Sequence, residues 1–441
     1  MTEGHWCGKG GCMWNFETDP VFQRKLDWAD RFVREEVELL DHALGDPADR
    51  EHPDTVAIAR PLMQRVKDQG LWACHLGPEL GGPGFGQVEL ALLNEILGRS
   101  RWAPTIFGSQ APDSGNAEVL AHFGTETQKR RFLTPLLAGE ISSAFSMTEP
   151  HAGADPALFT TRAVREGDSW VVNGEKWFTT NGRFANFLVL MVVTDPEVDV
   201  HRGMSMFLVP SDTPGIEIVR NLDVGTTGDA HESHSYVRYH DVRVPAELML
   251  GKEGQAFEIA QTRLGGGRVH QCMRAVAQMS KALDMMCERA VSRRVRSGRL
   301  ADLQMTQERV ADSWVELEQF KLLVMKTAWL IDKHQDYRKV RKDIAAVKIA
   351  MSNIYTKIVL RSLHLHGALG VSNELPLTEM LINAEVMAIG DGPVEVHKIV
   401  LAKHVLRSYE PGDPILPSQY LPTLRHAAAR TLGLSLDPAD V

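Results

Sequence analysis

Residues 145–155 read FSMTEPHAGAD, and residues 174–182 read GEKWFTTNG. The two segments bring hydroxyl, small and aromatic side chains together where apolar, strand-like runs reach the surface. This combination suits a flavin, which needs hydrogen bonds at its ring edge, backbone N–H groups near its pyrophosphate and a flat apolar wall. Thr-Glu-Pro and Asn-Gly are also ordinary turn sequences, so ordinary turns remain the alternative from the residues alone.

Both segments closely resemble the two flavin signatures in the middle domain of the acyl-CoA dehydrogenase family. The resemblance extends from about Phe16 to about Arg407. It is closest to the branch that animals fuse to a kinase-like domain, and it covers the dehydrogenase part only. The segments that carry it are APDSGNAEVL (111–120), RLGGGRVHQCMR (263–274) and GDGPVEVH (390–397).

The hydrophobic pattern changes twice along the 441 residues, a length that favours two or three packed subdomains. It is helical from residue 19 to about 139, strand-like from about 142, and helical again after 254. We therefore expect a multidomain α+β protein with the three-part order that the family shares. Its expected parts are a flexible N-terminal tail (1–15), a helical domain (16–141), a central antiparallel β barrel or sandwich (142–252), a C-terminal four-helix-type bundle (253–408) and a C-terminal tail (409–441).

Composition argues against several classes of function. The net charge is −9 without a basic stripe, so nucleic acid is not an expected partner. No run reaches ~18 apolar residues, so no membrane span is expected. The cysteines are odd in number and mostly in apolar contexts, which indicates reduced thiols in a cytoplasmic protein. His5, Cys7 and Cys12 lie among glycines, which favours a tail over a metal site.

The GDGP corner at residues 390–393 offers the candidate catalytic group, Asp391. From the residues alone, Asp391 followed by Pro393 favours a helix cap. The resemblance reverses that preference, because most of the family has YEGT at this corner and uses its glutamate to remove a proton beside a thioester. It therefore implies that Asp391 is the general base.

The proposed chemistry requires such a base, because an α-proton beside a thioester is only weakly acidic. Its removal must be coupled to hydride departure from the β-carbon onto flavin N5. The Asp side chain is about 1.5 Å shorter than that of Glu, so either the α-carbon of the substrate or the loop must shift to compensate. Some family members place the base where this chain has Gly267, so the site depends on Asp391. By resemblance, Gly267, Arg268 and Gly392 contact substrate; a structural ion pair is the equal alternative for Arg268.

The resemblance also assigns the cofactor, FAD, residue by residue. Phe178 replaces the usual Trp and Ala154 the usual Ser, so one hydroxyl contact is lost. The family borrows further contacts from a neighbouring subunit, which implies a homodimer or homotetramer. No metal site is expected. The implied contacts within the chain are Phe145, Met147, Thr148, Gly153, Ala154, Phe178, Thr180, Pro393 and Glu395, and those lent to the neighbour are Arg293, Gln304, His364, Gly367 and Ala368.

The resemblance thus implies an FAD-dependent acyl-CoA dehydrogenase of fatty acid metabolism that forms a trans-2-enoyl thioester and passes electrons to an electron-transfer flavoprotein. Two alternatives remain. One is a flavin oxidase similar to nitroalkane oxidases, which also use an Asp at this corner. The other is a non-catalytic flavin-binding or acyl-CoA-binding protein. Acyl length, branching and 4-hydroxy or 4-phospho substitution are open.

Overall fold

The computed structural model describes residues 16–153, 155–224 and 234–435. Its first part is helical. The first helix begins where the Asp19 carboxylate accepts a hydrogen bond from the backbone N–H of Val21 at 2.7 Å, with Pro20 at the first helical position. The helices of this part are α1 (Pro20–Phe32), α2 (Leu40–Ala43), α3 (Arg60–Asp68), α4 (Gln87–Leu97), α5 (Ala103–Ile106), α6 (Asp113–Phe123), α7 (Glu126–Gln128) and α8 (Thr134–Ala138).

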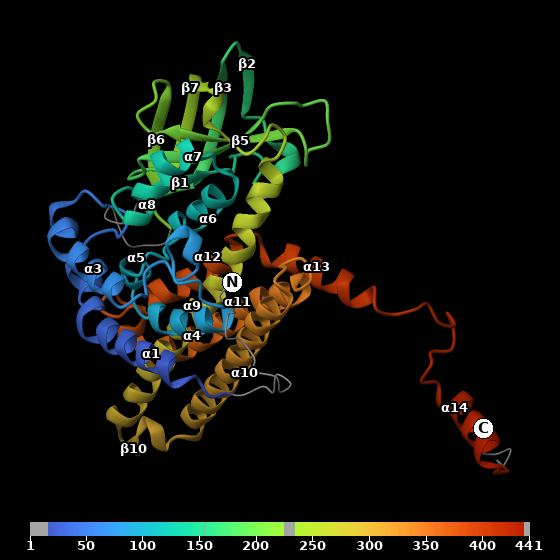
Figure 1. Ribbon diagram of the computed structural model, residues 1–441. Helices are drawn as coiled ribbons and strands as arrows, with labels where there is room; N and C mark the ends of the chain where they lie inside the picture. The colour runs from blue at the N-terminus through green and yellow to red at the C-terminus, as the bar shows by residue number, and fades with distance from the viewer. Residues whose placement is uncertain (1–15, 154, 225–233, 436–441) are drawn as a thin grey trace.

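The middle of the chain folds into one curved sheet of eight strands (Figure 1). Its order is β6-β7-β3-β1-β4-β5-β8, and β2 pairs with both β3 and β4. Most ladders are antiparallel as predicted, but β1 and β2 both run parallel to β4. The strands are β1 (Ser143–Ser146), β2 (Arg162–Glu166), β3 (Ser169–Thr180), β4 (Phe187–Val193), β5 (Met204–Pro210), β6 (Ile216–Leu222), β7 (His234–Pro245) and β8 (Met249–Leu250).

Strands β1 and β2 both lie between β3 and β4. The end of β3 pairs with β1 through Thr180, and its beginning pairs with β2. Likewise β4 begins beside β1 and ends beside β2 through Val193. Strands β1 and β2 thus share one place in the sheet. The described residues that connect them, 147–153 and 155–161, include most of the first flavin-like sequence.

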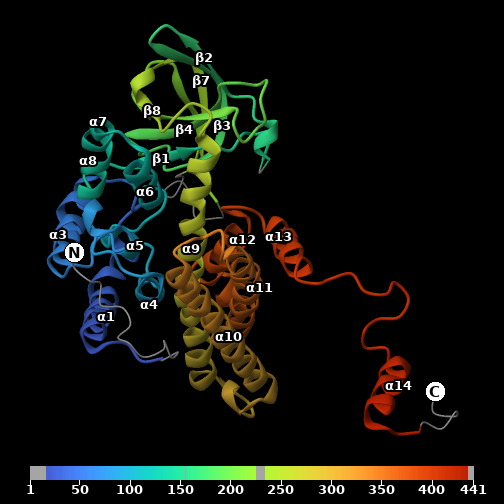
Figure 2. The same cartoon turned by 45° about the vertical axis from the view of Figure 1, so that its right-hand side comes forward.

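Long helices form the last part of the fold. Helix α9 begins beside the sheet and runs the length of the bundle, about 55 Å at ~1.5 Å per residue (Figure 2). The bundle and the N-terminal helices share one hydrophobic core, in which Leu90 and Leu93 of α4 lie with Cys272 and Met279 of α9. The helices are α9 (Ala256–Ser292), α10 (Gln304–His334), α11 (Arg341–His366), α12 (Leu377–Ile389) and α13 (Val394–Leu406); the short strands β9 (Arg294–Val295) and β10 (Gly298–Arg299) join α9 to α10.

The C-terminal segment leaves the body of the molecule after α13. It is extended through residue 420 and ends in helix α14 (Leu421–Leu432), which stands apart from the bundle in both views (Figures 1 and 2). Across the described ranges, every helix is too short or too polar to cross a bilayer.

Candidate active site

A buried ion pair between Glu149 and Lys176 joins the two flavin-like segments. The Lys176 side chain is 0% exposed and that of Glu149 is 3% exposed, with Nζ 2.8 Å from Oε1. Lys176 also donates to the Met147 carbonyl oxygen at 2.9 Å. Glu149 accepts hydrogen bonds from the backbone N–H groups of Thr160 and Thr161 at 2.7 and 3.0 Å. The pair therefore fixes the loop between β1 and β2 against β3.

Both members of this pair are charged at neutral pH. Burial lowers the pKa of Lys176 to about 8, and the Glu149 carboxylate opposes that shift. Burial alone would raise the pKa of Glu149, but Lys176 and the hydrogen bonds from Thr160 and Thr161 hold it below its ordinary value. Since each charge depends on the other, removal of one partner leaves an uncompensated buried ion.

Phe178 forms an exposed aromatic wall near the end of β3. Its backbone φ of +50° lies in the left-handed region, which bulky residues rarely adopt. The register between β3 and β7 shifts between Lys176 and Thr179, and such a bulge re-aims a side chain. The Phe178 ring is 47% exposed and stacks on Trp177 with ring centroids 4.9 Å apart. Backbone strain of this kind is typical of ligand-binding positions.

The predicted threonines flank this wall. The backbone N–H of Trp177 donates to the Thr148 carbonyl at 2.7 Å, which brings Thr148 beside β3. The Thr180 hydroxyl lies 3.1 Å from His234 Nδ1. Burial lowers the pKa of His234, so its ring is neutral at pH 7. The ends of the central strands β1 and β3, called the flavin-like edge below, thus gather the predicted contacts Phe145, Met147, Thr148, Phe178 and Thr180.

Asp391 occupies the loop between α12 and α13. Its φ of +56° is left-handed, a conformation that Asp tolerates better than most residues. Helix α13 has Pro393 at its N-cap position and no side-chain cap, so the interpretation of Asp391 as a helix cap is wrong. Its carboxylate Oδ2 instead accepts a hydrogen bond from Gln271 Nε2 at 2.8 Å.

Arg268 holds the same loop by its backbone. Its Nε donates to the Asp391 carbonyl oxygen at 2.7 Å, so its hydrogen bond to the loop is not made to a carboxylate. Burial lowers the pKa of Arg268, and the Asp391 charge opposes the shift. A Cβ on Gly392 would lie 3.3 Å from His397 Nε2, so any larger residue at position 392 would crowd the His397 ring.

Helix α9 presents bare backbone to two carboxyl groups. A Cβ on Gly267 would lie 3.3 Å from Asp391 Oδ2, and one on Gly266 would lie 3.4 Å from Glu118 Oε2. Burial raises the pKa of Glu118 to about 7, although the charge of Arg263 opposes the shift. The consecutive glycines therefore leave room beside two acidic side chains.

Arg263 connects this helix face to the flavin-like edge. Its guanidinium lies 3.9 Å from the centroid of the Phe145 ring, and its Nε donates to Asn116 Oδ1 at 3.0 Å. Burial lowers the pKa of Arg263, while the negative charges of Asp391 and Glu118 raise it. The flavin-like edge and the Asp391 loop are thus neighbours across one partly buried cation.

The remaining predicted residues lie elsewhere. Arg293 ends α9, at the opposite end of that long helix from the sheet. Arg361 of α11 pairs with Asp312 and Glu316 of α10, so the end of α11 lies beside the start of α10. Ala154 lies outside the described residues. The five residues predicted to serve a neighbouring subunit are exposed and belong to the C-terminal helical part, not to the sheet that carries Phe178, namely Arg293, Gln304, His364, Gly367 and Ala368.

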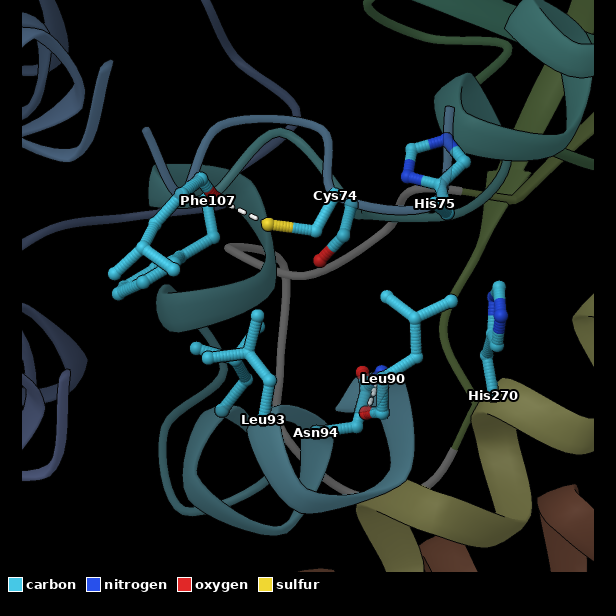
Figure 3. Close-up of a pocket in the computed structure, with 10 residues that line it drawn as sticks. Cys74, His75, Leu90, Leu93, Asn94, Phe107 and His270 are labelled. Atoms are coloured by element: carbon cyan, nitrogen blue, oxygen red, sulfur yellow. Dashed lines mark hydrogen bonds between the residues drawn. The ribbon is translucent and has the colours of Figure 1, made fainter. Parts of the chain in front are cut away.

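A small cavity lies between α4 and α9 (Figure 3). Its volume of about 10 Å³ is room for roughly one water molecule. His75 and His270 line it, and burial lowers their pKa values to about 4 and about 3, so both rings are neutral at pH 7. His270 adjoins Gln271 on α9. At this volume the cavity is too small for a thioester arm.

Comparison with known proteins covers nearly the whole chain. The models for the N-terminal, middle and C-terminal domains of acyl-CoA dehydrogenase match residues 23–140, 144–242 and 254–406. The probable acyl-CoA dehydrogenase FadE2 of Mycobacterium tuberculosis is 40% identical over 394 residues, which are 88% of this chain and 92% of that protein. The chain belongs to the acyl-CoA dehydrogenase family.

Relatives in animals are longer. Acyl-CoA dehydrogenase family member 11 of Rattus norvegicus is 38% identical over 82% of this chain, but the match spans only 46% of that protein. The chain thus spans about half the length of the animal relatives. A solved putative acyl-CoA dehydrogenase from Mycobacterium abscessus superposes with a TM-score of 0.83 at 35% identity, covering 90% of this chain and 100% of that one. The predicted three-part fold is confirmed.

As an acyl-CoA dehydrogenase family member, the protein is an oxidoreductase with FAD as its cofactor. The same fold carries FAD in PigA, with a TM-score of 0.77, 22% identity, and coverage of 90% of this chain and 100% of that one. The residues at the flavin-like edge fit such a ring: Trp177 Nε1 is buried without a hydrogen-bond partner among the described residues. Gly153, with φ +55°, has open space around it. Phe178 supplies the flat wall.

Several residues of this site escaped the sequence interpretation. The Glu149–Lys176 pair lay within the quoted segments, but nothing in either segment predicts their contact. Lys348 offered a better signal, since it stands one turn after Ile344 on the apolar stripe of α11 and is fully buried. A lysine on a buried helical face requires partners, and these prove to be Gln271 and Met387.

Proposed function

We propose that the protein oxidises an acyl-CoA thioester to the trans-2-enoyl thioester, with Asp391 as the base that removes the α-proton. The observation that carries this proposal is the placement of Asp391. Its carboxylate projects from a left-handed loop toward the bare backbone at Gly267, and Arg263 separates it from the flavin-like edge. No hydrogen bond from the described residues reaches its Oδ1.

In this mechanism each part of the loop has a separate task. Asp391 takes the α-proton while the C–H bond at the β-carbon breaks, and a double bond forms between the two carbons. When FAD is bound, its ring supplies the acceptor for the departing hydride. Arg268 fixes the loop through the Asp391 carbonyl. We assign the thioester arm to this side of α9, where Gly266 and Gly267 carry no side chain next to Glu118 and Asp391.

Anaerobic titration of the purified flavoprotein tests the proposal. The titrants are acyl-CoA thioesters of varied length, branching and 4-substitution, and the readout is loss of flavin absorbance. At least one thioester should bleach the flavin. Bleaching by a nitroalkane and by no thioester would favour the oxidase alternative, and no bleaching by either would favour a binding protein.

The proposal extends to the electron acceptor. We infer that electrons leave through an electron-transfer flavoprotein. Thioester-reduced enzyme should therefore reoxidise much faster with an electron-transfer flavoprotein than with dissolved oxygen, as followed by recovery of flavin absorbance. Rapid consumption of oxygen without an added acceptor would contradict this part of the proposal.

We further infer a homo-oligomer, a dimer or a dimer of dimers, with each flavin at a subunit boundary. Val315, Leu322 and Trp329 are exposed apolar residues seven positions apart, so they form a stripe along α10. Gln304 begins the same helix, and Arg293 is exposed at the end of α9. If a partner subunit packs on this stripe, Gln304 and Arg293 would contact the flavin bound to that partner.

The shared site predicts that dissociation releases the cofactor. Dilution should lower the FAD content per chain in parallel with the appearance of monomer, because the contacts lent by the partner leave with it. Sedimentation and flavin fluorescence measured over one dilution series test this. A monomer that keeps full FAD occupancy would contradict the shared site.

A further inference from the structure

Asp391 receives its hydrogen bond from a side chain that is itself held by a buried cation. Gln271 Nε2 donates to Asp391 Oδ2 at 2.8 Å, and Gln271 Oε1 accepts from Lys348 Nζ at 3.2 Å. Lys348 is 0% exposed and also donates to the Met387 carbonyl oxygen in the last turn of α12, four residues before Asp391. Three helices therefore converge on one carboxylate.

The polarity of this chain is fixed at its buried end. An ammonium carries donors only, so Lys348 must meet the oxygen of the Gln271 amide and not its NH₂ group. The NH₂ group is then turned toward Asp391, whose ionised carboxylate accepts only. Without Lys348 the amide could rotate by half a turn and present its oxygen to Asp391, which would repel the carboxylate.

The chain also distinguishes the two oxygens of Asp391. Oδ2 is occupied by Gln271 and lies against the backbone of α9 near Gly267. Oδ1 receives no hydrogen bond from the part of the chain that the structure describes. The left-handed backbone at Asp391 and the bond from Arg268 to its carbonyl hold the rest of the residue. One oxygen is therefore anchored beside Gly267, and the other is left without a hydrogen bond from the described residues.

We propose that Gln271 and Lys348 are positioning residues for Asp391: Lys348 sets the orientation of the Gln271 amide, which anchors Oδ2 and leaves Oδ1 to take the substrate proton. This inference rests on the proposed function of Asp391. Neither residue touches the reacting atoms. Their effect should fall on the rate of flavin reduction and not on thioester binding, because misorientation of a base by about 1 Å costs rate.

The test is a double-mutant cycle read by single-turnover flavin reduction with the most effective thioester. Lys348→Met should lower the limiting reduction rate about 10-fold and change the half-saturating thioester concentration less than threefold. Lys348→Arg, which keeps only donors, should restore most of the rate. Gln271→Leu should lower the rate about as much as Lys348→Met, and the double variant no further. The matched control is Lys357→Met. Lys357 lies on the same helix as Lys348 but is exposed and pairs with Glu316 of α10, so this variant should keep the wild-type rate.

Rate losses that multiply in the double variant would overturn the inference, because Lys348 would then act without Gln271. A wild-type rate in Lys348→Met would overturn it as well. If Lys348→Met does not fold, Gln271→Leu decides alone, and an unchanged rate there rejects the proposal. Asp391→Asn is measured in parallel: if that variant reduces its flavin normally, the proposed function fails first, whereas its inactivity beside unaffected Gln271 and Lys348 variants rejects only the positioning role.

Discussion

Replacement of Asp391 by Asn should lower the rate of flavin reduction by an acyl-CoA thioester by about 10²–10⁴, the usual contribution of a positioned base. The change is isosteric, Asn also tolerates the left-handed backbone at this position, and Gln271 Nε2 can still donate its hydrogen bond to the amide oxygen of Asn. Folding and FAD content should therefore match the wild type. Stopped-flow absorbance measures the rate, and the flavin spectrum measures the content.

Glu118 provides the comparison that makes this result specific. It is the second carboxyl group beside the glycines of α9, and its pKa of about 7 would suit a base. The rate of flavin reduction in Glu118→Gln should stay at least ~10-fold higher than the rate in Asp391→Asn. The opposite ranking would assign proton removal to Glu118. Asp391→Glu should keep partial activity, since it restores reach but fits the left-handed backbone less well.

Replacement of Lys176 by Met should destabilise the protein by roughly 3–5 kcal/mol, because it leaves the Glu149 carboxylate buried without its cation. The same change frees the Met147 carbonyl, which lies beside Thr148 at the flavin-like edge. Loss of FAD should accompany the loss of stability. The thermal midpoint and the FAD content per chain measure the two effects.

Two variants control this prediction. Lys176→Met combined with Glu149→Gln should recover part of the stability, since it removes the buried charge and the single amide oxygen can still accept one of the two backbone hydrogen bonds from Thr160 and Thr161. Arg243→Met breaks an exposed ion pair with Glu166 on the same sheet and should change stability by less than about 1 kcal/mol. Equal effects of Lys176→Met and Arg243→Met would mean that the buried pair has no special role.

The order of helices and strands could be predicted because periodicity is local. The runs at 187–193 and 204–209 indicated strands, and β4 and β5 occupy them. The parallel pairing of β1 with β4 could not be predicted, because it depends on which distant strands share a neighbour. The position of the connection between β1 and β2, which carries most of the first flavin-like sequence, follows from that pairing, so it could not be predicted either.

The candidate site was predictable only in part, for a similar reason. The resemblance at GDGPVEVH led to Asp391, whereas pattern alone favoured a helix cap that the structure does not contain. Gln271 and Lys348 are 77 residues apart and meet only through the packing of α9 against α11. A buried lysine signals that a partner exists but does not say which residue provides it.

If Asp391 removes the α-proton of an acyl-CoA thioester, it should do so even when no hydride can leave. A 3-thia-acyl-CoA isolates this step, because sulfur replaces the β-carbon and no hydride can leave. Exchange of its α-protons with D₂O, followed by mass spectrometry, should be fast with the wild-type protein and reduced by at least ~10² with Asp391→Asn. Equal exchange with both proteins would show that another group takes the proton and would contradict the account.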